Sequence, residues 1–255
     1  MSHCLKRIFV IVCFATICFG HFGCKTYYSS SSAVGMLVPL DSLMLPDSSS
    51  LAIIEPYQRA IEIEMNEIIS YSELDITKNQ PEGLLNNLIS DLVLHMCNKH
   101  FAEDGQLYDV VVLNNGGLRA ALPKGLITVG DVFRLMPFEN ETVVLTLTAD
   151  NFLKMVNYII QSGGVPFAGM TIKSKQLQLV DLTVNGKPFD ENRTYTVVTS
   201  DYLADGGDKM QFFNNPVKFK KLSVLLRDLI IDYFKEQNTI GNTIHPVLDG
   251  RIVYE

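Results

Sequence analysis

The chain has 255 residues, of which 47% are hydrophobic and 19% charged, and its formal net charge is -7. This length and composition allow a substantial hydrophobic core, which excludes a disordered chain, a collagen-like repeat and a coiled coil. No run of Lys or Arg forms a basic face, so nucleic acid is excluded as the main partner. Four of the five cysteines lie within the first 24 residues, and Cys97 alone remains in the body of the chain. No intramolecular disulfide framework is expected after processing.

The first 24 residues have the layout of a secretory signal peptide. Lys6 and Arg7 precede an apolar run over residues 8–19, and Gly23 stands directly before Cys24. The run is shorter than the about 20 apolar residues that a membrane span needs. We therefore expect that the protein is exported.

Cys24 resembles the lipidated cysteine of a bacterial lipoprotein, because polar residues and four serines follow it. An ordinary signal peptide cut nearby, or an uncleaved anchor, is the alternative. The lipoprotein interpretation places the protein in the bacterial cell envelope, held by a lipid anchor. Residues 25–50, rich in serine and proline, are then expected to tether the anchor to a domain over residues 51–255.

The first half of this domain is predicted to contain two helices and a buried strand. The second helix is expected over residues 84–101, and the apolar run at 109–113 predicts the strand. The Asn-Asn-Gly-Gly segment that follows predicts a turn with positive backbone angles. The first helix is predicted to be amphipathic, with Pro56 in its first turn. It is indicated by apolar residues at spacings of three and four, namely Ile54, Tyr57, Ile61, Met65 and Ile68.

In the second half, strands are predicted at 141–148, 177–184 and 194–199, and helices at 149–160 and 222–234. The Asn-Gly pair at 185–186 predicts a hairpin turn. Because helices and strands alternate irregularly, with hairpins among them, we predict a single α+β domain with a mixed sheet. The apolar residues expected to point inward from the last helix are Leu222, Leu225, Leu226, Leu229 and Ile230.

The sequence predicts no metal site and no catalytic residue in this chain. His95 and His100 share one predicted helix, but a spacing of five residues places them well apart around its axis. Half-buried helix positions are therefore favoured over a metal site. Cys97 has no flanking basic residue to lower its pKa, and neither a Gly-x-Ser-x-Gly elbow nor a phosphate loop is present.

Two turns carry more polar chemistry than a fold alone requires. In the first, adjacent glycines at 116–117 allow a ligand to approach the backbone, Asn114 offers a donor and an acceptor, and Arg119 offers a charged fork. In the second, over residues 199–208, a strand runs into a glycine turn between Tyr202 and Asp208.

Together with the Pro-Phe-Glu-Asn segment at 137–140, these turns resemble the C-terminal domain of the 5′-nucleotidase family in order and spacing. The family pattern has an Asn-Gly-Gly-Gly-x-Arg-like turn, a Pro-Phe-Gly-Asn-like loop and a Phe/Tyr-x-x-x-Gly-Gly-Asp turn. The resemblance extends from about residue 51 to the C-terminus. It implies a domain that binds a nucleoside or nucleotide.

The resemblance also implies a role for each matching residue. Phe138 and Tyr202 match two aromatic rings that clamp the base, and stacking on such a ring contributes ~1–3 kcal/mol. Asp208 matches a carboxylate that accepts from the ribose hydroxyls, and Arg119 an arginine directed toward the ribose and phosphate. The alternative makes both rings core aromatics and Asp208 a turn former. The expected substrate-binding residues, which include two asparagines near the base, are Asn114, Gly116, Gly117, Arg119, Phe138, Asn140, Tyr202 and Asp208.

The segment before the second helix departs from the family pattern. The family carries one or two arginines there that reach the phosphate, whereas residues 78–88 contain no arginine, and Leu84 stands near the place of an asparagine. Lys78 can supply a point charge but not a bidentate contact. Glu139 and Asn115 stand where the family pattern has glycines.

Family members also carry an N-terminal metallophosphatase domain with Asp-x-His, Gly-Asn-His and His-x-His motifs. This sequence contains none of these motifs, and the residues before Leu51 are too few to build that domain. We therefore expect the substrate-binding half of a split 5′-nucleotidase, with no cofactor of its own, and a divalent metal pair in a separate phosphoesterase subunit. The alternatives are a surface nucleoside-binding lipoprotein without a catalytic role, and a degenerate member kept as an interaction domain.

Overall fold

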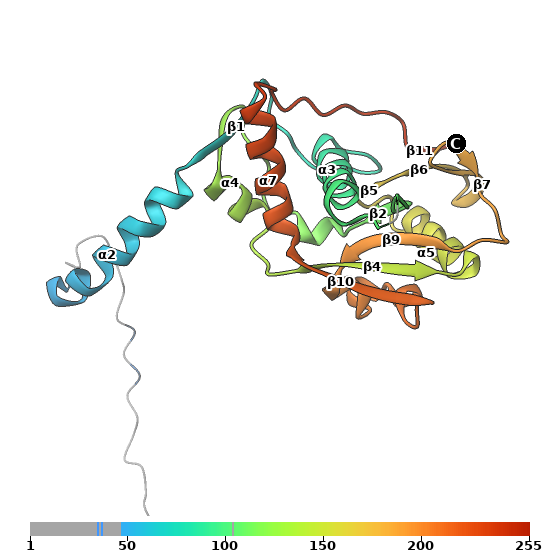
Figure 1. Ribbon diagram of the computed structural model, residues 1–255, viewed down its shortest axis with the longest axis horizontal. Coiled ribbons are helices and arrows are strands. Elements are labelled where there is room, and N and C mark those ends of the chain that lie inside the picture. The colour runs from blue at the N-terminus through green and yellow to red at the C-terminus, as the bar shows by residue number, and fades with distance from the viewer. Residues whose placement is uncertain (1–34, 36, 38–46, 104) are drawn as a thin grey trace, which may run out of the picture. The chain divides into compact units, whose positions relative to one another are not determined.

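The structure, a computed structural model, describes residues 35, 37, 47–103 and 105–255, and residues 51–255 form one compact unit (Figure 1). The signal peptide, Cys24 and most of the proposed tether lie outside the described residues. Among the described residues, no helix combines the length and apolarity that crossing a membrane requires. The elements are α2 (Ser48–Met65), β1 (Ile68–Ser72), α3 (Leu84–Phe101), β2 (Val110–Val112), η1 (Asn115–Gly117), β3 (Gly125–Thr128), α4 (Val129–Leu135), β4 (Glu141–Leu147), α5 (Ala149–Gln161), β5 (Phe167–Ala168), β6 (Met170–Lys175), β7 (Gln178–Val184), β8 (Lys187–Pro188), β9 (Tyr195–Ser200), α6 (Asp201–Ala204), η2 (Gly207–Lys209), η3 (Gln211–Phe213), β10 (Lys218–Leu225), α7 (Leu226–Thr239) and β11 (Ile252–Tyr254).

A five-stranded mixed sheet forms the centre of the domain, in the order β10-β4-β9-β2-β5. β2 and β9 run parallel, while the other neighbouring pairs are antiparallel. Two smaller sheets, β1-β3 and β11-β6-β7-β8, complete the domain. The prediction of an α+β domain with a mixed sheet is confirmed.

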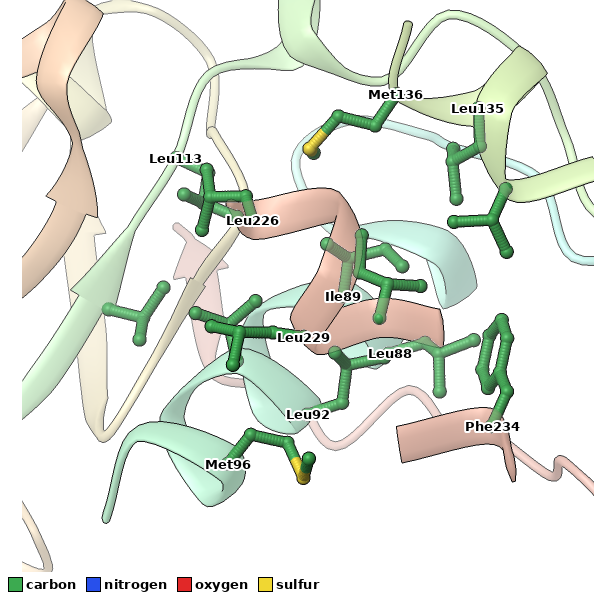
Figure 2. Close-up of a cluster of buried hydrophobic side chains, with 14 of the residues drawn as sticks. Leu88, Ile89, Leu92, Met96, Leu113, Leu135, Met136, Leu226, Leu229 and Phe234 are labelled. Atoms are coloured by element: carbon green, nitrogen blue, oxygen red, sulfur yellow. The ribbon is translucent and has the colours of Figure 1, made fainter. Parts of the chain in front are cut away.

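Both faces of the central sheet are buried. Alternate side chains of β2 enter different clusters, since Val111 packs in one core while Val110 and Val112 pack in the other. The first core holds side chains of α3 and α7 (Figure 2), and the second holds those of α5. A strand buried on both faces needs an unbroken apolar run, which explains the valine run of β2.

Local patterns predicted some of these elements closely. α3 has the predicted bounds, and α5 ends one residue later than expected. The turn between β7 and β8 has positive φ at both Asn185 and Gly186, as a two-residue hairpin of this kind requires.

The predicted start of the last helix is wrong by four residues. Leu222 and Leu225 lie on β10, and α7 begins only at Leu226. β10 pairs with β4 from Lys218 onward, and Ser223 adopts a left-handed φ of 55° where the pairing is interrupted. Leu222 and Leu225 are three residues apart in the sequence, which resembles the spacing of one helical turn, although both lie on the interrupted strand.

The first helix also differs from its prediction. α2 begins at Ser48, so Pro56 lies in its interior rather than in its first turn, and Ile68 belongs to β1. The helix buries none of its residues among those that the structure describes. Its apolar residues Ile54, Tyr57 and Ile61 are exposed.

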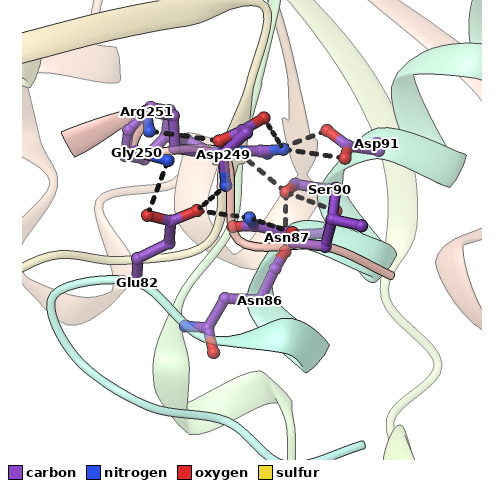
Figure 3. Close-up of polar contacts among 10 residues, drawn as sticks. Glu82, Asn86, Asn87, Ser90, Asp91, Asp249, Gly250 and Arg251 are labelled. Carbon is purple, nitrogen blue, oxygen red and sulfur yellow. Dashed lines mark hydrogen bonds and ion pairs between the residues drawn. The ribbon is translucent and has the colours of Figure 1, made fainter. Parts of the chain in front are cut away.

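The C-terminal segment is fastened to α3 through Arg251 (Figure 3). The Arg251 side chain is 8% exposed, and its guanidinium donates to both oxygens of Asp91 at 2.8 Å. It also donates to the Asp249 carboxylate at 3.0 and 2.9 Å and to the Phe167 carbonyl at 2.7 Å. Five donated bonds satisfy the buried guanidinium and connect β11 with the core.

Glu82 makes a second connection to the same segment. Its carboxylate accepts from the backbone N–H groups of Asp249 at 2.8 Å and Gly250 at 3.1 Å, and from the Asn87 amide at 2.6 Å. The start of α3 and the C-terminal strand are therefore held as one unit.

We expect Arg251→Met to lower the free energy of unfolding by about 2 kcal/mol, because it removes charge-assisted hydrogen bonds to two carboxylates that are each about half-exposed. Urea denaturation measures this loss. The matched control is Arg134→Met, since Arg134 pairs with Asp131 but is 68% exposed, and its expected cost is below about 1 kcal/mol. Equal costs for the two variants would contradict a stabilising role for the buried guanidinium.

The contribution of Asp249 depends on pH. Burial acts to raise the pKa of Asp249, but the hydrogen bonds and charge of Arg251 outweigh it and hold this pKa below its ordinary value. A carboxylate with a depressed folded-state pKa stabilises the fold above its unfolded pKa of about 3.9 and loses that contribution as the pH falls through the folded value. We expect the stability difference between the wild type and Arg251→Met to be constant near neutral pH. It should shrink below about pH 4 in urea titrations; a difference that grows with acid would refute this assignment.

Candidate functional site

The directions of three central strands bring the predicted site residues to one edge of the sheet. β2 and β9 are parallel, so the turn after β2 and the turn after β9 emerge at the same edge. β4 is antiparallel to β9, with Thr142 opposite Ser200, so β4 starts at this edge and the loop before it ends there. At this edge the buried Thr199 hydroxyl donates to the Val112 carbonyl at 2.8 Å and fastens β9 to β2.

The glycine turn after β2 is a short 3-10 helix, η1, closed by a bond from the Gly117 N–H to the Asn114 carbonyl at 3.1 Å. The prediction of positive backbone angles in this turn is wrong, because no residue at 114–117 has a positive φ. Glycine is needed at 117 for space. A Cβ there would lie 2.8 Å from Oδ1 of Asn114, so Gly117 leaves room for the asparagine side chain.

Asp208 is the common acceptor of the site. Its Oδ2 accepts from Nδ2 of Asn114 at 2.6 Å, and its Oδ1 accepts from the Tyr202 hydroxyl at 2.9 Å. The Tyr158 hydroxyl donates to its backbone carbonyl at 2.8 Å. Asp208 itself adopts a left-handed φ of 51°. These bonds fix the carboxylate between the two turns.

Tyr158 remains a hydrogen-bond donor over the whole neutral range. Burial, followed by the charge of Asp208 and the presence of Tyr202, raises the pKa of Tyr158 above its ordinary value. Its hydroxyl is therefore protonated at neutral pH.

The loop that carries Phe138 is held from behind by two further residues. Oδ1 of Asp201 accepts from the backbone N–H groups of Glu141 at 3.2 Å and Tyr202 at 2.8 Å, which links the start of β4 to α6. Arg227 is buried, lies 4.1 Å above the Phe133 ring and donates to the Phe138 carbonyl at 3.3 Å. The position of the Phe138 loop therefore depends on α6 and α7.

All eight residues predicted to bind substrate line a single cavity of about 350 Å³. Phe138 is 39% exposed and Tyr202 47% exposed, so both rings lie at this cavity rather than in the core. Its volume falls within the range of about 300–1,000 Å³ that is typical of small-molecule sites. The eight residues are Asn114, Gly116, Gly117, Arg119, Phe138, Asn140, Tyr202 and Asp208.

The cavity combines two aromatic faces with few charges. Arg119 is the single cation and Asp208 the single anion among its eight lining residues. Such a lining suits a planar heterocycle that carries hydroxyl groups, because rings stack on the base and a carboxylate accepts from the hydroxyls. Lys78 is not among the lining residues, and its Nζ donates instead to the backbone carbonyls of Asn115 and Leu118.

Sequence reasoning missed Tyr158, Asp201 and Arg227. Arg227 carried a detectable signal, since it is a charged residue within an apolar run. Tyr158 and Asp201 carried none, because their contacts with Asp208 and Glu141 join segments that lie 50 and 60 residues apart.

The described residues do not fit a metal pair. No three His, Cys, Asp or Glu side chains among them lie close enough to hold an ion. His95 packs edge-on against Tyr233, and Nε2 of His100 lies 3.5 Å from Glu236. Burial raises the pKa of the Cys97 thiol to about 12, so Cys97 is not a reactive thiolate.

A larger hollow of about 970 Å³ lies between α3 and α7. Charged groups at its border already pair with one another, as Lys99 and Glu236 do at 2.6 Å. None of the residues predicted to bind substrate lines this hollow, so the smaller cavity is the better candidate site.

Gly207 permits the observed position of Tyr202. A Cβ at residue 207 would lie 2.5 Å from the Tyr202 carbonyl oxygen and 2.6 Å from the ring atom Cε1. We expect Gly207→Ala to cost about 1–3 kcal/mol of stability in urea denaturation, because the backbone and ring must shift. The matched control is Gly116→Ala, whose Cβ would lie 3.3 Å from its nearest neighbour, Nδ2 of Asn114, and so farther away than either contact at Gly207, with an expected effect within about 0.5 kcal/mol. Similar costs for both variants would contradict the close packing at Gly207.

Similarity to solved structures supports this architecture. The chain aligns with the 5′-nucleotidase precursor of Thermus thermophilus with a TM-score of 0.67 and 24% identity, covering 81% of this chain and 43% of that chain. It aligns with the NAD nucleotidase of Haemophilus influenzae with a TM-score of 0.61 and 18% identity, covering 82% and 41%. At these identities the alignments show the fold alone.

Sequence relatives and a family pattern agree with the fold. The chain is 24% identical to the trifunctional nucleotide phosphoesterase protein YfkN of Bacillus subtilis, in an alignment that covers 85% of the present chain. It is 25% identical to protein UshA of Escherichia coli, in an alignment that covers 54% of the present chain. It spans only 16% and 26% of these two relatives. The pattern of the family described as "5′-nucleotidase, C-terminal domain" matches residues 63–215, more than half of the chain. The chain therefore belongs to the 5′-nucleotidase C-terminal domain family.

Proposed function

We propose that this chain is the nucleoside- and nucleotide-binding half of a split 5′-nucleotidase. It would support the hydrolysis of nucleoside phosphate esters by a separate phosphoesterase subunit that holds a divalent metal pair. The observation that carries the proposal is the single cavity, lined by two exposed aromatic rings, a hydrogen-bonded carboxylate and one arginine.

Each part of a nucleoside has a counterpart in this cavity. The base would stack on Phe138 and Tyr202, with Asn114 and Asn140 at its polar edge. Asp208 already accepts two bonds, but an ionised carboxylate has about four acceptor positions, so the remaining ones can receive the ribose hydroxyls. Arg119 would meet a phosphate group.

The proposal assigns hydrolysis to the partner. The described residues offer no metal cluster, and the cavity contains no residue that we assign to the bond-breaking step. One relative is named a nucleotide phosphoesterase, and this chain matches only a small part of it. We further propose that the protein is exported and held in the bacterial cell envelope by a lipid on Cys24.

Removing either ring should weaken nucleoside binding. We expect Phe138→Ala and Tyr202→Ala each to raise the Kd for adenosine by roughly five- to 150-fold, the equivalent of ~1–3 kcal/mol of stacking. Isothermal titration calorimetry of the purified protein measures this change. Tyr202→Phe is the matched control: it keeps the ring and loses only the bond to Asp208, so its affinity should remain closer to that of the wild type. Unchanged affinity in both alanine variants would refute the clamp.

The split arrangement has its own test. The purified chain should release no phosphate from AMP in the presence of Mn²⁺, and release should appear when the phosphoesterase subunit is added. Adenosine binding without any stimulation of a partner would indicate a nucleoside-capturing lipoprotein. If the chain binds neither adenosine nor AMP, the result would indicate the remaining alternative, a degenerate family member kept as an interaction domain.

A further inference from the structure

Lys78 lies at the rear of the glycine turn and contacts its backbone. The ammonium group donates to the Leu118 carbonyl at 2.9 Å and to the Asn115 carbonyl at 3.2 Å. These two carbonyls belong to the first residue of η1 and to the residue that follows it. One side chain from the segment between β1 and α3 therefore holds both ends of the turn.

The side chain of Asn115 holds the same turn from another direction. Its Oδ1 accepts from Nδ2 of Asn86 at 2.9 Å, and its Nδ2 donates to the Gly164 carbonyl at 2.9 Å. Asn86 is only 2% exposed. Nε2 of Gln80 donates to the same Gly164 carbonyl at 2.8 Å. Asn115 thus uses the side chain that a glycine at this position lacks to connect the turn to α3 and to the loop before β5.

These contacts are of the kind that fixes a backbone. A three-residue 3-10 turn leaves carbonyl groups without partners inside the helix, and unpaired carbonyls are costly unless another donor reaches them. An ammonium is a strong donor because charge-assisted hydrogen bonds are shorter and stronger than neutral ones. Two of the three N–H groups of Lys78 are used in this way, and the residue does not line the cavity.

We propose that Lys78 is a positioning residue of the binding site rather than a ligand of the phosphate. This inference rests on the proposed function. Lys78 fixes the carbonyls at residues 115 and 118, the turn places Asn114, and Asn114 holds Asp208 through the 2.6 Å bond. Loss of Lys78 therefore disturbs the part of the cavity that binds the nucleoside.

Calorimetric titration of Lys78→Met with adenosine and with AMP separates the two roles. A positioning lysine predicts that both affinities fall by the same factor, about five- to tenfold. A phosphate-binding lysine predicts that only the AMP affinity falls, and that result would overturn the proposal. Lys78→Arg should restore both affinities, because a guanidinium can also donate to two carbonyls. Lys187→Met, at an exposed position of β8, is the matched control and should change neither.

Amide hydrogen exchange tests the same inference without a ligand. The Gly117 N–H closes the turn on the Asn114 carbonyl, so its exchange should accelerate about fivefold or more in Lys78→Met, while the core amide of Val111 keeps its wild-type rate. Unchanged exchange at Gly117 would contradict a positioning role. If Lys78→Met does not fold, Lys78→Gln provides the second variant, with a smaller acceleration expected at Gly117 because a neutral donor remains. A wild type that binds neither adenosine nor AMP would refute the proposed function, whereas the Gly117 rates would still decide the role of Lys78.

Discussion

The relative direction of β2, β9 and β4 is the constraint on which the rest of the site depends. Because β2 is parallel to β9 and β4 is antiparallel to it, two strand ends and one strand start meet at a single edge. Three short segments separated by many residues thereby line one cavity. Both faces of this sheet are buried, one against α3 and α7 and the other against α5 and the sheet that contains β6 and β7. The ends of the strands are therefore the place where polar turns can emerge into solvent.

A network of hydrogen bonds fixes the cavity before any ligand arrives. Asp208 accepts from Asn114 and Tyr202, and its backbone is held by Tyr158. Such preorganisation favours binding, since side chains that are already ordered lose less entropy when a ligand binds. Gly207 and Gly117 contribute by leaving space, because a Cβ at either residue would meet a neighbour at under 3 Å.

The segment before α3 differs from the family pattern. The family arginines in this segment are expected to reach phosphate, whereas here Lys78 of the segment and Asn86 in the first turn of α3 contact the glycine turn. The cavity is left with one cation, Arg119, opposite one anion, Asp208. On our proposals, contacts with the nucleoside contribute more to the affinity of this cavity than contacts with the phosphate. A partner subunit then hydrolyses the phosphate ester.

The sequence by itself determined those features that depend on neighbouring residues. Helical spacing defined α3, a continuous valine run defined β2, and the Asn-Gly pair defined the hairpin after β7. The eight cavity residues were predicted from the resemblance of three ordered motifs to the 5′-nucleotidase family, since neither turn is specific by itself. Local chemistry is sufficient for the helix, the strand and the hairpin, since the interactions involved span only a few residues.

Only the tertiary structure decided the rest. The boundary between β10 and α7 depends on pairing with β4, where Leu225 lies opposite Glu141, 84 residues earlier in the chain, which hydrophobic spacing does not encode. The turn after β2 lacks the expected positive φ because it closes as the 3-10 helix η1, whose residues have negative φ. The role of Lys78 depends on carbonyls 37 and 40 residues further along the chain. Such contacts exist only after the strands have paired, because a lysine in an unfolded chain carries the same charge whether it will bind a phosphate or a backbone turn.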